Sequence, residues 1–184
     1  MADARAFALP LPDRARCRVG VVRSDDASMH ANLLSLLRAL RVAGAPLALP
    51  DGPRLRAALA DQPRAGTIEW LAHADATPLA AIDVVVHRRD PLRPDADDAP
   101  VVDAQAAGRV VIALDVELHD PTLIDPGRTG FLARHAGDAV DVALRLARDA
   151  ASRHAVGAAA RAAVRARDDD QARRSAAFYR GTIR

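Results

Sequence analysis

The chain has 184 residues, half of them hydrophobic and only 3% aromatic, which suits one globular domain with an aliphatic core. The formal net charge is +2, every basic residue is an arginine, and no basic block is interleaved with aromatic residues, so nucleic-acid binding has no support. The single cysteine excludes an internal disulfide and a multi-cysteine metal site. No apolar run has the length of a signal peptide or a membrane helix, so we expect a cytoplasmic protein of bacterial type.

Residues 1–16 have no periodicity and resemble a linker, so a single domain is expected over residues 17–184. Short apolar, β-branched runs predict strands at 17–22, 46–50, 67–72, 82–87 and 109–114. An amphipathic helix that ends at Gly44 separates the first two strands, and a shorter helix follows the turn at Asp51. The strands and helices alternate, which is typical of a parallel sheet.

The segment from Ile82 to Val116 carries most of the functional information. Its two strands enclose an acidic, proline-containing loop and a short helix that ends at Gly108. The loop contains Asp95, and Asp103 follows eight positions later. Because ligands of open α/β sheets bind at the carboxyl ends of the strands, this loop is the first candidate for a binding site.

The last third of the sequence is predicted to be helical. A long irregular segment after the fifth main strand ends in GFLA, which suits a short edge strand. One helix is expected to start at an Asp138 N-cap and a second at a Ser152 N-cap. The run of three aspartates at 168–170 is expected to end that second helix, and a last helix follows it. The sequence therefore predicts a doubly wound parallel α/β sheet of Rossmann type with extra C-terminal helices.

Several motifs in a fixed order give this chain a resemblance to a known family. The segments VGVVRS, LALPDGPRLRAAL, IDVVVHRRD, VVDAQAAGRVVIALDV and PTLIDPGRTGFLA resemble those of the C-terminal, nucleotide-sugar-binding half of GT-B glycosyltransferases of the family 4 or "group 1" type. The resemblance covers about residues 17–180 and implies half of a GT-B fold, without the N-terminal acceptor domain.

The resemblance also implies roles for particular residues. The family's E-x7-E motif maps onto Asp95, which would face the transferred sugar, and Asp103, which would bind the ribose. Arg23 matches the family arginine that holds the donor diphosphate, and Ser28 stands where its lysine would be. Arg88 or Arg89 would replace that lysine, and His119 lies near the expected sugar pocket. The list of implied site residues is therefore Asp95 and Arg23 as catalytic, and Asp103, Arg88, Arg89 and His119 as substrate-binding.

Each of these residues also has a structural interpretation. Asp103 would complement the dipole of its helix, Asp95 would belong to a solvated acidic loop, and the two arginines would pair with nearby acids. The glycines that follow the family's first glutamate are replaced here by Ala96, Asp97 and Asp98, whose charges would repel a diphosphate.

Two functions follow from these observations. The first is a glycosyltransferase domain, retaining and of the hexosyltransferase type if active, that binds a UDP- or GDP-sugar and needs neither a metal nor another cofactor. It would act with a separate acceptor-domain protein or as a homodimer. The second is a non-catalytic, degenerate glycosyltransferase module that acts in protein interaction.

Overall fold

The computed structural model describes residues 8–11, 17–21, 31–60, 67–72, 78–88, 98–114 and 122–182, with the backbone alone at 31, 32, 78 and 178–182. Within these residues the strands are β1 (Val19–Gly20), β2 (Leu47–Pro50), β3 (Ile68–Leu71), β4 (Val84–Arg88), β5 (Val110–Leu114) and β6 (Phe131–Ala133). The helices are α2 (Ala31–Val42), α3 (Pro53–Ala60), the 3-10 turn η1 (Pro78–Ala80), α4 (Ala99–Ala106), α5 (Ala136–Arg148) and α6 (Ala150–Thr182).

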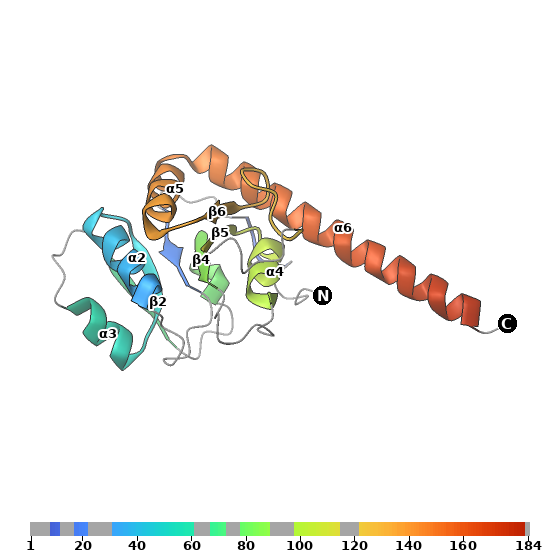
Figure 1. The fold of residues 1–184 in the computed structure, drawn as a ribbon, viewed down its shortest axis with the longest axis horizontal. Helices are drawn as coiled ribbons and strands as arrows, with labels where there is room; N and C mark the ends of the chain where they lie inside the picture. The colour runs from blue at the N-terminus through green and yellow to red at the C-terminus, as the bar shows by residue number, and fades with distance from the viewer. Residues whose placement is uncertain are drawn as a thin grey trace.

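The strands form one six-stranded parallel sheet in the order β3-β2-β1-β4-β5-β6. The chain builds outward from β1 to β3, returns to pair β4 with β1, and then builds outward in the other direction (Figure 1). This order confirms the predicted doubly wound sheet, and the GFLA segment does supply the edge strand β6. The direction of winding reverses between β1 and β4, so this pair of strands marks the place where such sheets bind ligands.

Helices cover both faces of the sheet. On one face, α2, α3 and α5 bury leucines and alanines such as Leu36, Leu59 and Leu146 against Val84 and Val86 of β4. On the other face, α4 and α6 pack against the intervening strand residues, which include Val85 and Val111. Alternate side chains of one strand thus enter two different cores, which is why its sequence is apolar at every position.

Glycines end two of the helices at the places that the sequence predicted. Gly44 and Gly108 have positive φ angles of 81° and 69° and lie just after α2 and α4, as the sequence predicted. A Cβ atom at Gly20 would overlap the carbonyl oxygen of Ala48 and the side chain of Ile82. Trp70 is partly buried against the core, and the guanidinium of Arg56 lies 4.5 Å from the centre of its ring.

The C-terminal helices differ from the sequence prediction. Helix α5 begins at Ala136 with His135 as its N-cap, and the imidazole Nδ1 accepts a hydrogen bond from the Asp138 backbone, so Asp138 lies in the first turn. Helix α6 begins at Ala150, before Ser152, and continues without a break through residues 168–170. Asp170 is paired with Arg174, one turn later, and this pairing offsets the low helix propensity of aspartate.

Candidate functional site

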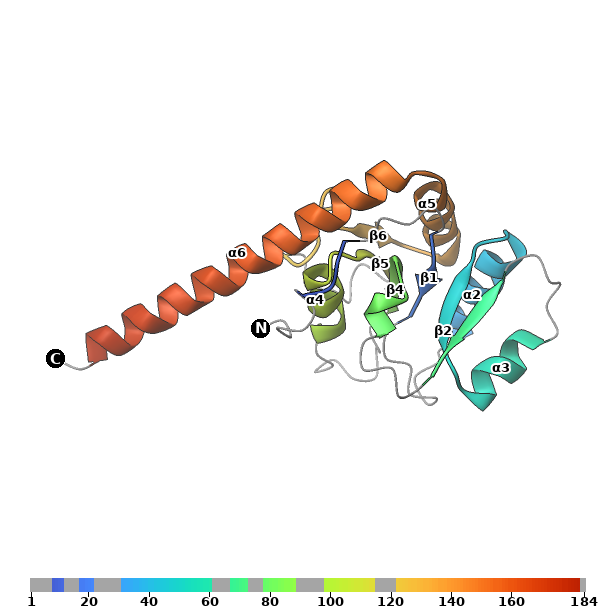
Figure 2. The ribbon, with the colours of Figure 1, turned by 180° about the vertical axis from the view of Figure 1, so that it is seen from behind.

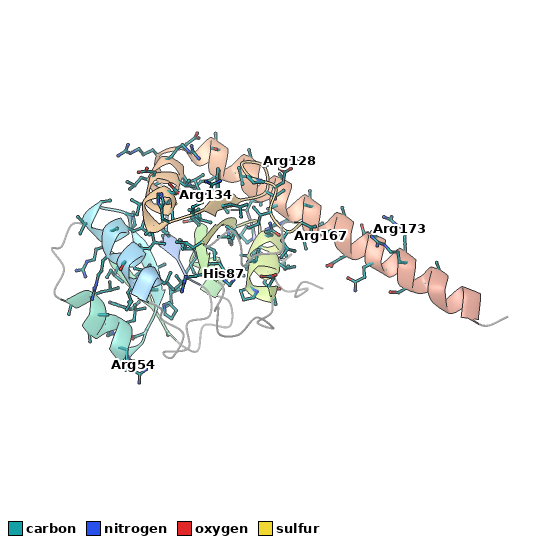
Figure 3. The ribbon with its side chains drawn as sticks, in the orientation of Figure 1. Arg54, His87, Arg128, Arg134, Arg167 and Arg173 are labelled. Carbon is teal, nitrogen blue, oxygen red and sulfur yellow. The ribbon has the colours of Figure 1, made fainter. Side chains whose placement is uncertain are left out.

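The reversal of winding places one predicted site residue at the expected edge of the sheet. Arg88 is the last residue of β4, the strand next to β1, and it pairs in register with Leu114 at the end of β5. Its side chain is half-buried. His87, the preceding residue, is also half-buried and comes from the central strand of the molecule (Figure 3). A guanidinium at this edge suits an anionic ligand.

Helix α4 begins at the same edge, because it runs back antiparallel to β4 and β5. Its N-cap is Asp98, with φ −76° and ψ 9°, and the Asp98 side chain makes no capping hydrogen bond to the helix. Proline stands at position 100, in the first turn, where its missing N–H is of no consequence. The first turn of α4 therefore directs a partial positive charge toward the edge of the sheet, although the carboxylate of Asp98 lies beside it.

Asp103 lies one turn into α4 and is half-buried. Arg88 and Asp103 thus belong to the same strand–helix–strand unit, one at the end of β4 and the other on the helix that follows it. The other four implied site residues, Arg23, Arg89, Asp95 and His119, lie outside the described residues. The catalytic pair expected from the sequence is therefore not described, while two of the four substrate-binding residues are.

Gln105 is a buried connection that sequence reasoning missed. Its side chain is fully buried, and its Nε2 donates to the carbonyl oxygens of Leu123 at 2.9 Å and Thr129 at 3.3 Å. Its Oε1 accepts from Nη2 of Arg167 on α6, also at 2.9 Å. Figure 3 shows Arg167 at the place where α6 passes α4. The amide therefore joins α4 to α6 and to the segment before β6. The one sequence feature that could have indicated this role is a polar residue on the apolar side of a short helix.

The segment before β6 is a compact turn. The backbone N–H of Asp125 donates to Oγ1 of Thr129 at 2.8 Å, and the N–H of Gly127 donates to the Gly130 carbonyl at 2.8 Å. Gly127 has a φ of 80°, and a Cβ at Gly130 would lie 2.9 Å from the carbonyl oxygen of Val111. These residues serve turn geometry.

Arginines of α6 hold the ends of the neighbouring helices. Arg161 donates from Nε to the Ala106 carbonyl at 3.0 Å and from Nη2 to the carbonyls of Ala107 and Leu9, both at 2.6 Å. Arg153 is buried and donates to the carbonyls of Leu146 and Ala147 at the end of α5. Burial lowers the pKa of Arg161, and the charge of nearby Arg165 lowers it further. Both arginines satisfy helix carbonyls and are therefore structural.

The described residues offer neither a metal site nor a membrane span. They contain no group of three or more histidine, cysteine or acidic residues that could hold an ion. None of the helices in this part of the chain is long and apolar enough to cross a bilayer.

Solved structures resemble this domain, whereas no protein-family model and no curated protein sequence matches the chain. The C-terminal domain of a group 1 family glycosyltransferase, LpcC, from Francisella tularensis is 15% identical, with a TM-score of 0.61, and the match covers 90% of this chain and 97% of that one. Sucrose-phosphate synthase from Thermosynechococcus elongatus is 22% identical, with a TM-score of 0.60, over 99% of this chain and 49% of that one.

A third neighbour was solved with a nucleotide sugar. HepE from Anabaena, in complex with UDP-glucose, is 18% identical with a TM-score of 0.58, and the match covers 81% of this chain and 44% of that one. The chain spans about a third to a half of the length of the larger structures that it matches.

The fold is therefore that of a doubly wound domain whose winding reverses between β1 and β4. More particularly, it is the fold of the C-terminal half of a GT-B glycosyltransferase, as the order of the sequence motifs indicated.

Proposed function

We propose that this chain is the donor-binding domain of a glycosyltransferase and takes a nucleotide-diphosphate sugar at the carboxyl edge of β1 and β4. One observation carries the proposal: the match covers 97% of the C-terminal domain of a group 1 glycosyltransferase. Arg88, at the edge where winding reverses, supports it. The HepE neighbour, solved with UDP-glucose, supports a nucleotide sugar as the ligand class.

In this proposal each residue contacts a different part of the donor. Arg88, together with Arg23 or Arg89, would balance the charge of the diphosphate, which grows on the leaving group as the sugar departs. The carboxylate of Asp103 would accept two hydrogen bonds from the ribose diol. Asp95 and His119 would face the sugar, as the motif positions suggest.

Transfer of the sugar would require a second body to bind the acceptor. The chain matches only a third to a half of the larger neighbours, so the acceptor-binding site would come from a separate domain or from another copy of the chain. The cytoplasmic location expected from the sequence is compatible with a nucleotide-sugar donor.

One observation favours the second function, a degenerate module that acts in protein interaction. Asp98 is the N-cap of α4, so its carboxylate lies at the helix end that would otherwise attract a diphosphate. The negative charge of this carboxylate would repel a diphosphate bound at the same helix end. Replacing Asp98 with glycine removes this repulsion, and the two functions therefore predict different effects of the same change.

Calorimetric titration with UDP and GDP tests the proposal. We expect one of the two nucleotides to bind the unmodified chain, and Arg88→Ala to weaken it by roughly 10- to 100-fold, which corresponds to the loss of a charge-assisted hydrogen bond. Asp103→Asn should weaken it less, because the amide keeps one acceptor. Arg128→Ala changes an exposed arginine before β6 and serves as the matched control (Figure 3).

The outcomes separate the functions. If neither nucleotide binds the unmodified chain but Asp98→Gly creates binding, the degenerate module is correct and its cause is identified. If neither the unmodified chain nor the Asp98→Gly variant binds UDP or GDP, the donor role is wrong. If Arg88→Ala and Arg128→Ala have equal effects, the ligand binds elsewhere.

A further inference from the structure

Helix α4 is held at its last turn by α6. The two helices lie side by side in both views of the molecule (Figures 1 and 2). Arg161 of α6 donates to the backbone carbonyl oxygens of Ala106 and Ala107. Arg167, further along α6, donates to Oε1 of Gln105 at 2.9 Å. A helix of eight residues has little stability of its own, so the position of α4 depends on such contacts with its neighbours.

The Gln105 amide has only one orientation that satisfies its partners. Its Nε2 faces the carbonyl oxygens of Leu123 at 2.9 Å and Thr129 at 3.3 Å, which can only accept. Its Oε1 faces the guanidinium of Arg167, which can only donate. Turning the amide over would set acceptor against acceptor and donor against donor. Because the side chain is fully buried, such unsatisfied groups would be costly, and the amide is therefore locked.

This lock fixes the rotation of α4 about its own axis. Asp103 stands two residues before Gln105, which is about 200° around a helix and about 3 Å along it. The two side chains therefore leave α4 in nearly opposite directions, and Gln105 is fully buried whereas Asp103 is half-buried. A rotation of the helix that moved the amide would turn the Asp103 carboxylate by the same angle. Whatever holds Gln105 therefore also sets the direction of Asp103.

We propose that Gln105 and Arg167 are positioning residues of the donor site. The Gln105 amide, held between Arg167 and the carbonyls of Leu123 and Thr129, keeps α4 in the rotation at which the Asp103 carboxylate accepts from the ribose diol. In this scheme both residues act through Asp103 rather than on the donor itself. The inference rests on the proposed function, because the ribose contact of Asp103 is part of that proposal.

A double-mutant cycle with Asp103 tests the inference on the full chain. Arg167→Met keeps the apolar stem and removes the donor to Gln105, so it should weaken UDP or GDP binding by roughly 3- to 10-fold in calorimetric titration. In an Asp103→Ala background the same change should have almost no further effect, because the residue through which it acts is already removed. Arg167→Lys keeps a charged donor and should retain most of the affinity.

Arg173→Met is the matched control, since it removes the same charge from an exposed position on the same helix (Figure 3). It should leave the affinity unchanged. Urea unfolding checks that each variant is folded at the titration temperature. A role in stability alone would lower the unfolding midpoint of Arg167→Met and leave the Kd of the folded chain unchanged. If Arg167→Met does not fold, Gln105→Glu takes its place in the cycle, because it keeps the acceptor for Arg167 and loses both donations to carbonyls.

The outcomes separate this role from the donor function. If the unmodified chain binds neither nucleotide, the donor function fails and this role fails with it. If the unmodified chain binds and Arg167→Met has the same affinity as Arg173→Met, the donor function stands and the positioning role alone is wrong. Equal losses with and without Asp103 also overturn the role, because the effect would not pass through that residue. A loss that appears only when Asp103 is present supports it.

Discussion

The two halves of α6 form one continuous helix in quite different surroundings. Both contain alanines and arginines, yet the first half fits into the domain through a few specific contacts, whereas residues 171–177 of the second half are exposed. In the first half, a Cβ at Gly157 would overlap the carbonyl oxygen of Gly108, and Arg161 binds three backbone carbonyls. Composition determines that a segment is helical, whereas the position of single residues determines what that helix can pack against.

Gly157→Ala should have the largest effect on stability. The methyl group would meet a backbone carbonyl that cannot rotate away, and overpacking of this kind costs about 3 kcal/mol. Alanine has a better helix propensity than glycine by about 1 kcal/mol, which reduces the net loss. Urea unfolding measures the change. The same substitution at Gly181, in the second half, should leave the midpoint unchanged or slightly raised, and an equal loss at both positions would contradict this account.

Arg161→Ala should come next. It removes the hydrogen bonds to the end of α4 and to Leu9, which leaves partly buried carbonyls without their donor and costs about 2 kcal/mol. Arg173→Ala is the control in the second half, since its side chain is largely exposed and lies 4.0 Å from Asp170. It should change the free energy of unfolding by less than about 0.5 kcal/mol. Equal effects would mean that the three carbonyl contacts of Arg161 contribute nothing.

Cys17 makes the stability of the folded chain depend on pH in the alkaline range. Burial raises the pKa of its thiol from 9.0 to about 12, against the charge of Arg153 on α6, which lowers it. The unfolded chain loses this proton near pH 9 while the folded chain keeps it, so stability should fall as pH rises from about 9 to 12. The slope is about 1.4 kcal/mol per pH unit. Cys17→Ala should abolish this slope, and a slope that persists in the variant would assign it to other groups.

The smallest effect is expected at the three aspartates. Asp170→Ala removes the ion pair with Arg174, which supports the helix by about 0.3–0.5 kcal/mol. Alanine has a higher helix propensity than aspartate by about 0.7 kcal/mol, which offsets the lost pair, so neither the helix content measured by circular dichroism nor the global stability should fall. A large fall in global stability would show that α6 has tertiary contacts beyond residue 168.

The candidate site was predictable in part. The resemblance of the sequence motifs to a known family implied Arg88, at the end of the fourth main strand, and Asp103, in the helix that ends at Gly108. The structure places them in one strand–helix–strand unit, although their part in binding a donor stays a prediction. Gln105 escaped notice because its three partners come from segments 18, 24 and 62 residues away, and no local pattern connects them.

The sequence by itself determined the order of the strands and helices, the glycines that end α2 and α4, and the doubly wound class of the sheet. These features depend on local periodicity and backbone conformation, which adjacent residues specify. Only the tertiary structure decided that α6 is continuous, that Gly157 lies against Gly108, and that Gln105 is a buried connection. The reason is physical: each of these outcomes depends on packing, ion pairs or hydrogen bonds that the folded chain supplies, whereas propensity alone predicted a break at residues 168–170.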